Sequence, residues 1–237
     1  MSTIREKIEQ NFFSDIHERL VDFLSGKISS KLSEQDKPDI DEYYVQEQCK
    51  TILENRVPKI ENSLKIVRNK SHGPLKEQVL ATAQMSFNPQ IDIRILGSDY
   101  KMLYAVYEVK SRLQDNEING NDIYADIQRL AIVKRVFPKV KCIFILPGLF
   151  QPMKNDFEKN DIKLPNTFNI SGNPNYKRKG RYKSVDLDIN ISNTNHDVLK
   201  NLKVGKINVR LSQTAKGKKH ILFTYEIKIK NGHEQGV

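Results

Sequence analysis

The chain has 237 residues, with 39 Lys and Arg against 29 Asp and Glu, and a formal net charge of +10 at pH 7. Its longest apolar run, Cys142 to Phe150, is interrupted by Pro-Gly and is too short to cross a bilayer, and the first residues lack a secretion signal's apolar core. We therefore expect a soluble cytoplasmic protein. Its two cysteines, Cys49 and Cys142, are predicted to be buried thiols rather than a disulfide or a zinc site, because both lie in apolar patterns.

The positive charge is concentrated in the C-terminal third. Residues 1–153 contain 22 Lys and Arg against 21 Asp and Glu, whereas residues 154–237 contain 17 against 8. Such an asymmetry indicates a polyanionic partner bound by one region of the chain. The alternative is that the excess charge serves solubility or unspecific association with nucleic acid.

Two amphipathic helices are predicted at the N-terminus. The first covers residues 3–32, with Gly26 as a point where it is expected to kink or end. We expect it to pack on the core, and an oligomer interface is the alternative. The second covers residues 39–57, begins at a cap formed by Asp39 or Asp41 and stops before Pro58. The expected inner faces are Ile4, Ile8, Phe12, Ile16, Leu20, Phe23 or Leu24, and Ile28 in the first helix, and Val45, Cys49, Ile52 and Leu53 in the second.

The next segment is less regular. A short strand or helix is expected around residues 64–67, a loop at 71–74, and a helix at 75–83 that leads into the first central strand.

Two strands joined by a polar turn carry the strongest chemical signal. They are residues 91–95 and 104–110, and residues 96–101 form the turn. Because side chains alternate along a strand, Glu108 and Lys110 share one face, and Asp92 points away from the neighbouring isoleucines. In a hairpin of suitable register these three side chains converge.

Two acids and a lysine at one point favour a particular chemistry. Paired carboxylates form an oxygen site for Mg²⁺, and an ammonium can orient water or stabilise the charge that develops at phosphorus. This predicts metal-assisted phosphodiester hydrolysis. The alternative is an exposed ion pair. However, the second strand is apolar on both faces, which indicates a central strand, and charged side chains are rarely buried there unless they are paired or bind a ligand.

A helix and a buried strand follow the strand pair. Residues 121–137 have helical apolar spacing that ends before Pro138, and residues 140–146 read as a buried strand closed by Pro147 and Gly148. Prolines and glycines then predict a loop-rich segment from Gly148 to Asn175.

The residues Pro89-Gln90-Ile91-Asp92, followed by Glu108-Val109-Lys110, resemble the PD-(D/E)XK nuclease superfamily, which includes many restriction endonucleases. In that family the first acid lies in one central strand, the E-x-K motif lies on the next, and a helix crosses over to a further strand. The resemblance covers about residues 84–148. It departs from the family pattern at Gln90 and Ile91, because the family's proline often stands directly before the acid.

The resemblance implies an α/β fold with a restriction-endonuclease-like mixed central sheet flanked by helices, followed here by a basic, β-rich C-terminal part. It implies that Asp92, Glu108 and the carbonyl group of Val109 bind Mg²⁺, and that Lys110 helps to activate water. Members often add a glutamate from a helix, for which Glu42 is the first candidate. Further accessory candidates are Glu47, Glu77, and Gln128 or Tyr124 on the helix at 121–137.

A basic stretch near residue 180 is the second functional signal. Lysine and arginine neutralise phosphates, and tyrosine can bind a phosphate or stack on a base, so we expect contact with nucleic acid rather than a solvated loop. Strands are predicted at 185–191, 206–211 and 221–229, the last two as a hairpin with a basic turn. The expected contact residues are Tyr176, Lys177, Arg178, Lys179, Arg181, Tyr182, Lys183, Lys216, Lys218 and Lys219.

The sequence thus predicts an N-terminal helix and connector (1–38), a nuclease core (39–153) and a basic DNA-contacting region (154–237). The expected function is that of a Mg²⁺-dependent endodeoxyribonuclease, of the type II restriction kind, acting on double-stranded DNA. A homodimer is expected, because cutting both strands commonly uses two active sites. The alternatives are a non-catalytic nucleic-acid-binding module with the nuclease fold, and a nuclease directed at RNA or at repair substrates.

Overall fold

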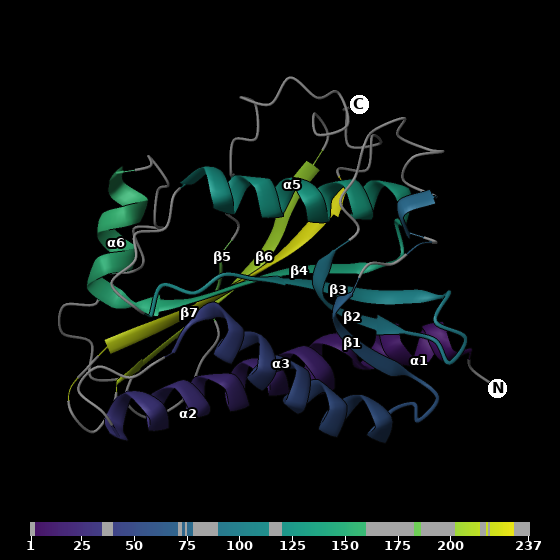
Figure 1. The fold of residues 1–237 in the computed structure, drawn as a ribbon, viewed down its shortest axis with the longest axis horizontal. Helices are drawn as coiled ribbons and strands as arrows, with labels where there is room; N and C mark the ends of the chain where they lie inside the picture. Colours follow the sequence, from purple (N-terminus) through teal and green to yellow (C-terminus); the bar gives the residue numbers. More distant parts are fainter. Residues whose placement is uncertain are drawn as a thin grey trace, which may run out of the picture.

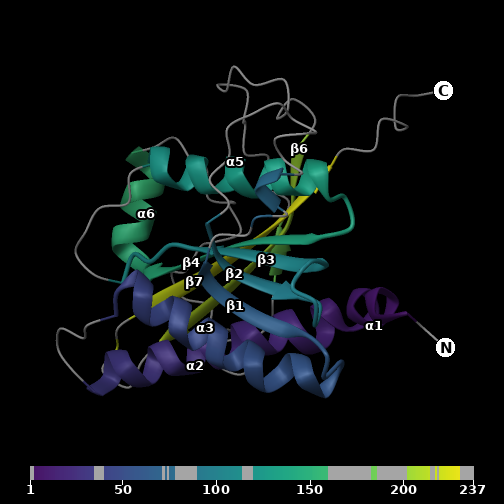
Figure 2. The same cartoon turned by 45° about the vertical axis from the view of Figure 1, so that its right-hand side comes forward.

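A computed structural model describes residues 3–34, 40–70, 73, 75–77, 90–113, 120–159, 183–185, 202–213, 217 and 219–229. They form a mixed seven-stranded sheet in the order β1-β2-β3-β4-β7-β6-β5 with helices on both faces (Figures 1 and 2). The expected α/β class is therefore confirmed. The strands are β1 (Lys65–Lys70), β2 (Ile91–Leu96), β3 (Leu103–Val109), β4 (Lys141–Leu149), β5 (Lys183–Val185), β6 (Leu202–Gln213) and β7 (Lys219–Ile229).

The helices form two layers. In Figure 1 the N-terminal helices lie below the sheet, and α5 and α6 lie above it. None of the described helices has the length and apolarity needed to cross a membrane. The helical segments are α1 (Ile4–Asn11), the π-helical turn η1 (Phe12–His17), α2 (Glu18–Glu34), α3 (Glu42–Arg56), the 3-10 turn η2 (Val57–Lys59), α5 (Gly120–Val136) and α6 (Phe150–Lys159).

The first predicted helix is one helical run that contains a π-helical turn. It begins at Thr3, whose side chain forms a capping box with Glu6. It passes through Gly26, where we expected a kink or an end, because α2 extends to Glu34. Of the two alternatives for its inner face, Leu24 is buried and Phe23 is 45% exposed.

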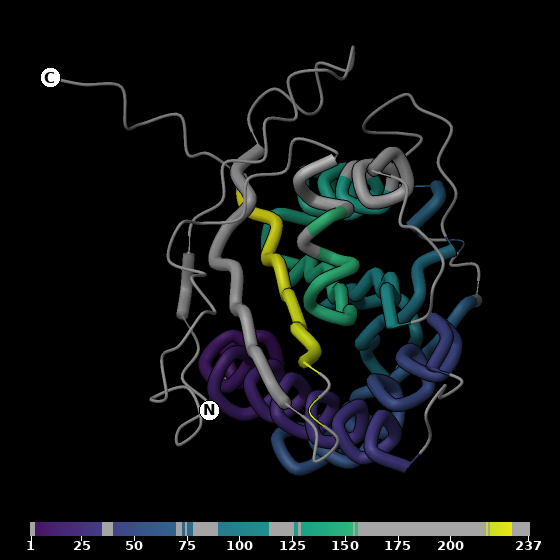
Figure 3. The backbone as a smooth tube through the Cα atoms, turned by 90° about the vertical axis from the view of Figure 1, so that its left-hand side faces the viewer, coloured from purple at the N-terminus to yellow at the C-terminus, as the bar shows by residue number. Residues whose placement is uncertain are grey.

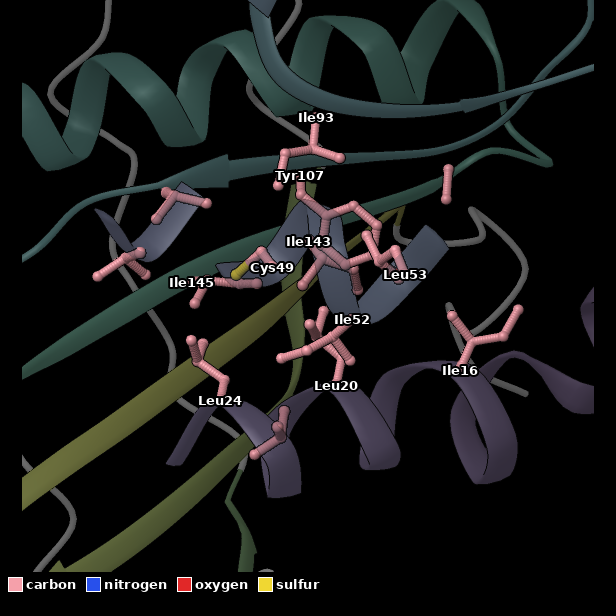
Figure 4. Close-up of a cluster of buried hydrophobic side chains, with 14 of the residues drawn as sticks. Ile16, Leu20, Leu24, Cys49, Ile52, Leu53, Ile93, Tyr107, Ile143 and Ile145 are labelled. Atoms are coloured by element: carbon pink, nitrogen blue, oxygen red, sulfur yellow. The ribbon is translucent and has the colours of Figure 1, made fainter. Parts of the chain in front are cut away.

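The second predicted helix matches α3 closely. Asp41 caps it by accepting a hydrogen bond from Tyr44 N at 2.7 Å. All four residues of its expected inner face are buried, and Figure 4 shows three of them facing side chains of α2 and of the sheet. This layer holds α3 against β1, β2 and β3, and the contact between Glu42 and Lys110 places the start of α3 beside the end of β3.

The strands around the expected site pair as the site requires. β1 is antiparallel to β2, and β2 is antiparallel to β3. β4 is parallel to β3, so α5 provides the crossover that a parallel pair needs. The helix packs over β3, β4 and β7 through an apolar cluster that includes Ile127, Leu130 and Phe144.

Two expectations for residues 147–159 are wrong. Pro147 and Gly148 do not close the strand, since β4 runs on to Leu149; the Pro147 carbonyl still accepts a hydrogen bond from Arg112 N at 2.8 Å. The segment that follows is not all loop, because α6 begins at Phe150. Pro152 lies in the first turn of α6, where the missing N–H breaks no helical hydrogen bond.

The C-terminal strands belong to the same sheet as the central ones. β6 and β7 form the expected hairpin, and β7 pairs antiparallel with β4. Figure 3 shows β7, in yellow, extending from beside the N-terminal helices towards the level of α5. Strands on both sides of the expected boundary at residue 153 therefore share one sheet.

Candidate active site

Asp92 and Glu108 lie opposite each other on neighbouring strands. Ile93 pairs with Tyr107, and one step along this antiparallel register places Asp92 across from Glu108. Facing residues in such a pair point to the same side of the sheet. Asp92 is partly buried and accepts a hydrogen bond from Val109 N to Oδ2 at 2.7 Å, while Glu108 is only 1% exposed.

Lys110 connects this acid pair to two helices. It shares a face with Glu108 because it is two residues further along the chain. Its Nζ lies 3.3 Å from Glu42 Oε2, at the start of α3, and 3.5 Å from Asp126 Oδ2, on α5. The lysine is thus placed between the two helical layers, at the end of β3.

Arg129 brings a second cation to the acid pair. Its Nη1 donates to Glu108 Oε1 at 2.7 Å, and its Nη2 lies 3.4 Å from Asp126 Oδ1 one turn earlier on α5. A longer contact of 3.5 Å joins Nη1 to the carbonyl oxygen of Gln90. The guanidinium therefore lies between the strand that carries Glu108 and its own helix.

Burial dominates the electrostatics of the acids. It raises the pKa of Glu108 well above its usual value, helped by the neighbouring Asp92 and opposed by Arg129. Burial also raises the pKa of Asp92, against the lowering effect of the Val109 N–H, and it raises the pKa of Asp126 against Lys110 and Arg129. Burial also raises the pKa of Glu42, the acid of α3 that contacts Lys110.

For the two cations, the effect of the neighbouring acids on the pKa outweighs the effect of burial. Burial alone would lower the pKa of Lys110, but Asp126 and Glu42 outweigh it and raise that pKa. Burial likewise works against the charge of Arg129, whose pKa is raised by Glu108 and Asp126. Both side chains therefore stay positively charged beside acids that ionise reluctantly.

A cavity of about 510 Å³ opens next to this cluster. Asn69, which has a left-handed φ of 45°, donates from Nδ2 to Gln46 Oε1 at 2.8 Å, and Gln46 in turn donates to Glu42 at 3.3 Å. Tyr43 is 59% exposed, and its ring centroid lies 4.2 Å from the Arg68 guanidinium carbon. The cavity is lined by Glu42, Tyr43, Gln46, Asn69, Gln90, Asp92 and Arg129.

Whether a metal ion fits depends on the acid pair. In the part of the chain that the structure describes, no three His, Cys, Asp or Glu side chains are grouped closely enough to hold one. Mg²⁺, however, usually keeps several waters and is bound through one or two carboxylates. Asp92 and Glu108 supply two, and the Arg129 guanidinium already places a positive charge beside Glu108.

The sequence-based candidates fall into three groups. Asp92, Glu108 and Lys110 are brought together, and Glu42 joins them through Lys110. Val109 contacts Asp92 through its N–H, and metal binding by its carbonyl group remains a prediction. Glu47 pairs with Arg68 of β1 at 2.6 Å, and Glu77 is exposed.

Sequence reasoning missed Asp126 and Arg129. Their spacing of three residues puts them on one side of α5, next to the apolar residues Ile127 and Leu130. An acid and a base beside the inner face of the helix after the E-x-K strand were the available signal.

Several of the predicted nucleic-acid contacts and accessory residues fall outside the described residues, or have side chains that the structure does not describe. This holds for Tyr176, Lys177, Arg178, Lys179, Arg181, Tyr182, Lys216 and Lys218, and for the side chains of Tyr124, Gln128 and Lys183. Lys219 is described and is exposed at the start of β7.

Comparison of the chain with models of protein families, with curated proteins and with solved structures found no match.

Proposed function

We propose that this chain is a metal-dependent nuclease of the PD-(D/E)XK type, acting as a Mg²⁺-dependent endodeoxyribonuclease of the restriction kind. The observation that carries the proposal is the register of β2 and β3, which sets Asp92 across from Glu108 with Lys110 beside them. The proposed partner is double-stranded DNA, approached by the basic C-terminal third of the chain, and the proposed assembly is a homodimer.

The order of elements supports the proposal. The resemblance implies an acid on one central strand, E-x-K on the next, and a helix that crosses over to a further strand. Here β2 and β3 are antiparallel neighbours, α5 follows, and β4 returns parallel to β3. A restriction-endonuclease-like fold is therefore the form that we propose for the central part of the sheet.

Each of these residues has its own role in the proposed cleavage reaction. Asp92 and Glu108 would hold Mg²⁺, which when bound supplies a Lewis acid and lowers the pKa of its water. Glu42 and Asp126 hold the Lys110 ammonium on both sides, 3.3 and 3.5 Å from their oxygens. From there Lys110 orients the attacking water and stabilises the negative charge that builds at phosphorus.

The test is cleavage by the purified chain of plasmid, linear duplex, single-stranded DNA and RNA, with Mg²⁺ and with EDTA. We expect Mg²⁺-dependent cleavage of duplex DNA. Asp92→Ala should reduce the rate by more than about a hundredfold, because even the loss of groups that only orient a metal ligand costs 10- to 100-fold. Glu9→Ala, the same kind of change at an exposed acid on α1, is the matched control. Wild-type cleavage by a folded Asp92→Ala protein would show that this strand pair is not the active site.

One observation favours a second candidate, a nucleic-acid-binding module without catalysis. The Arg129–Glu108 ion pair and the Lys110 contacts neutralise the cluster without any metal ion. Such a module would bind DNA equally well with EDTA and would leave all four substrates intact. The same assay therefore separates the two candidates.

A further inference from the structure

Arg129 lies where a metal ion would neutralise the acid pair. Its Nη1 is 2.7 Å from Glu108 Oε1, and Glu108 is almost completely buried opposite Asp92. Two carboxylates in such positions repel each other when both are ionised, unless a cation lies close to them. The chain supplies that cation itself, from α5.

We propose that Arg129 is a built-in counter-ion of the metal-free site, which must leave Glu108 when a divalent cation binds and is then free to contact a phosphate group of the nucleic acid. The inference rests on the proposed function, since it takes Asp92 and Glu108 as the metal ligands.

Competition follows from the contacts of Glu108. A guanidinium and a divalent cation cannot both use Oε1, and their like charges repel each other at such short range. Arg129 has somewhere to go, because Asp126, on the same helix, already lies 3.4 Å from its Nη2. The exchange thus needs a rotation of one side chain and no movement of the sheet.

Release directs Arg129 towards substrate. The residue already lines the cavity beside Asp92, together with Gln46 and Gln90. A planar guanidinium can bind a phosphate with two parallel hydrogen bonds. Metal and nucleic acid should therefore strengthen each other's binding, and by thermodynamic linkage the factor is the same in both directions.

Titration calorimetry with Mn²⁺ on the full chain, without nucleic acid, tests the competition. We expect Arg129→Gln to bind Mn²⁺ about tenfold more tightly than the wild type. The wild type must break the charged hydrogen bond between Arg129 and Glu108 when the metal binds, and the variant has no such bond to break. Arg129→Lys keeps the charge without the planar group and should fall between the two. Arg135→Gln, an exposed position on the same helix, should behave as wild type.

The opposite result overturns the inference. If Arg129→Gln binds Mn²⁺ with wild-type affinity or more weakly, Arg129 supports the metal site or is unrelated to it. Absence of Mn²⁺ binding by the wild type and by all variants would overturn it as well. Should Arg129→Gln fail to fold, the comparison of Arg129→Lys with wild type decides, since tighter binding is expected only under competition.

A second measurement checks the fate of the released side chain. With Ca²⁺ present, Arg129→Gln should bind duplex DNA about tenfold more weakly than Arg135→Gln, although it binds metal more tightly. Unchanged DNA affinity would overturn the phosphate contact. Failure of the proposed function looks different, because the Mn²⁺ results would then hold while no substrate is cut.

Discussion

Lys110 is the residue to which the proposed function gives a role in the cleavage step itself. An ammonium cannot act as a metal ligand, so Lys110→Ala should leave metal binding and Ca²⁺-supported DNA binding within about threefold of wild type. The single-turnover cleavage rate in Mg²⁺ should fall by about a hundredfold or more, as it does when a donor to a developing anion is removed. Lys101→Ala, an exposed lysine in the turn between β2 and β3, is the control. A large loss of DNA binding with a normal rate for the bound complex would make Lys110 a docking residue.

Glu108 should give the metal-free protein an unusual dependence on pH. Its pKa is raised by burial in the folded state, so its contribution to stability is fully present below about pH 4.5, its ordinary value, and is lost as the pH rises through the raised pKa. In EDTA, the melting temperature of the wild type should therefore fall more between pH 4.5 and 8 than that of Glu108→Gln, by about 2–4 °C per kcal/mol of difference.

Comparing the wild type with Glu108→Gln cancels the contributions of other titrating groups to the pH dependence of stability. Burial lowers the pKa of His17 to about 4, so this histidine contributes stability above pH 6.5 that is lost as the pH falls towards 4. His17 is present in both proteins and cancels in the difference. Equal pH slopes for wild type and Glu108→Gln would mean that Glu108 is ionised and fully compensated by Arg129 throughout this range.

At the scale of elements, two glycines test the fold in opposite directions. A Cβ at Gly148, near the end of β4, would meet Met153 Sδ and would lie 3.0 Å from Arg112 Cβ, so Gly148→Ala should cost about 1–3 kcal/mol of unfolding free energy. A Cβ at Gly26 in α2 would meet nothing within 4 Å, and Gly26→Ala should stabilise the helix by about 0.5–1 kcal/mol.

Urea unfolding of both variants measures the two effects. Replacing Met153 by Ala in the Gly148→Ala background should recover part of the loss, if the sulfur atom causes the overlap. If Gly148→Ala does not lower the unfolding free energy, α6 moves away from β4 without cost.

Sequence patterns predicted the elements well where local spacing sets them. Apolar spacing placed α3 and its inner face, because one turn of a helix repeats within a few residues. The strand pair carrying Asp92 and Glu108 was predicted for the same reason, and its turn is held by the Asp99 side chain, which accepts hydrogen bonds from Lys101 N and Met102 N. The register that makes the acids face each other follows from that short connection.

Other parts depended on contacts that local spacing does not contain. Arg129 belongs to the site only because α5 packs over β3, a contact between residues about twenty positions apart. In the sheet β7 lies beside β4, and the apolar pattern of a single strand does not specify which strand it will pair with. Pro147 was read as a strand end, although in this sheet its carbonyl group still accepts from Arg112.

At the scale of the whole molecule, the N-terminal helices share one buried apolar cluster with the central sheet. Phe12 is fully buried and stacks on Tyr107 of β3, with ring centroids 6.3 Å apart. Phe12→Ala should therefore cost about 3–5 kcal/mol and lower the midpoint of one unfolding transition for the entire protein. Phe23→Ala, at a site 45% exposed beneath Arg56, should cost less than about 1 kcal/mol.

Circular dichroism and tyrosine fluorescence, followed together through urea unfolding, check this prediction. The two signals should move to the same lower midpoint in Phe12→Ala. Loss of the helical signal alone, with an unchanged tyrosine transition, would show that the first helices unfold separately from the sheet.

The position of β7 also has a consequence for synthesis of the protein on the ribosome. β4 carries a row of apolar residues, and one of its edges is paired only with β7, about eighty residues later in the chain. Until residue 229 has left the exit tunnel, a nascent chain that has formed β1 to β4 exposes that edge to other chains. Slow translation or a stalled ribosome within the last third should therefore leave an aggregation-prone intermediate, and chaperones that bind exposed strands should protect it.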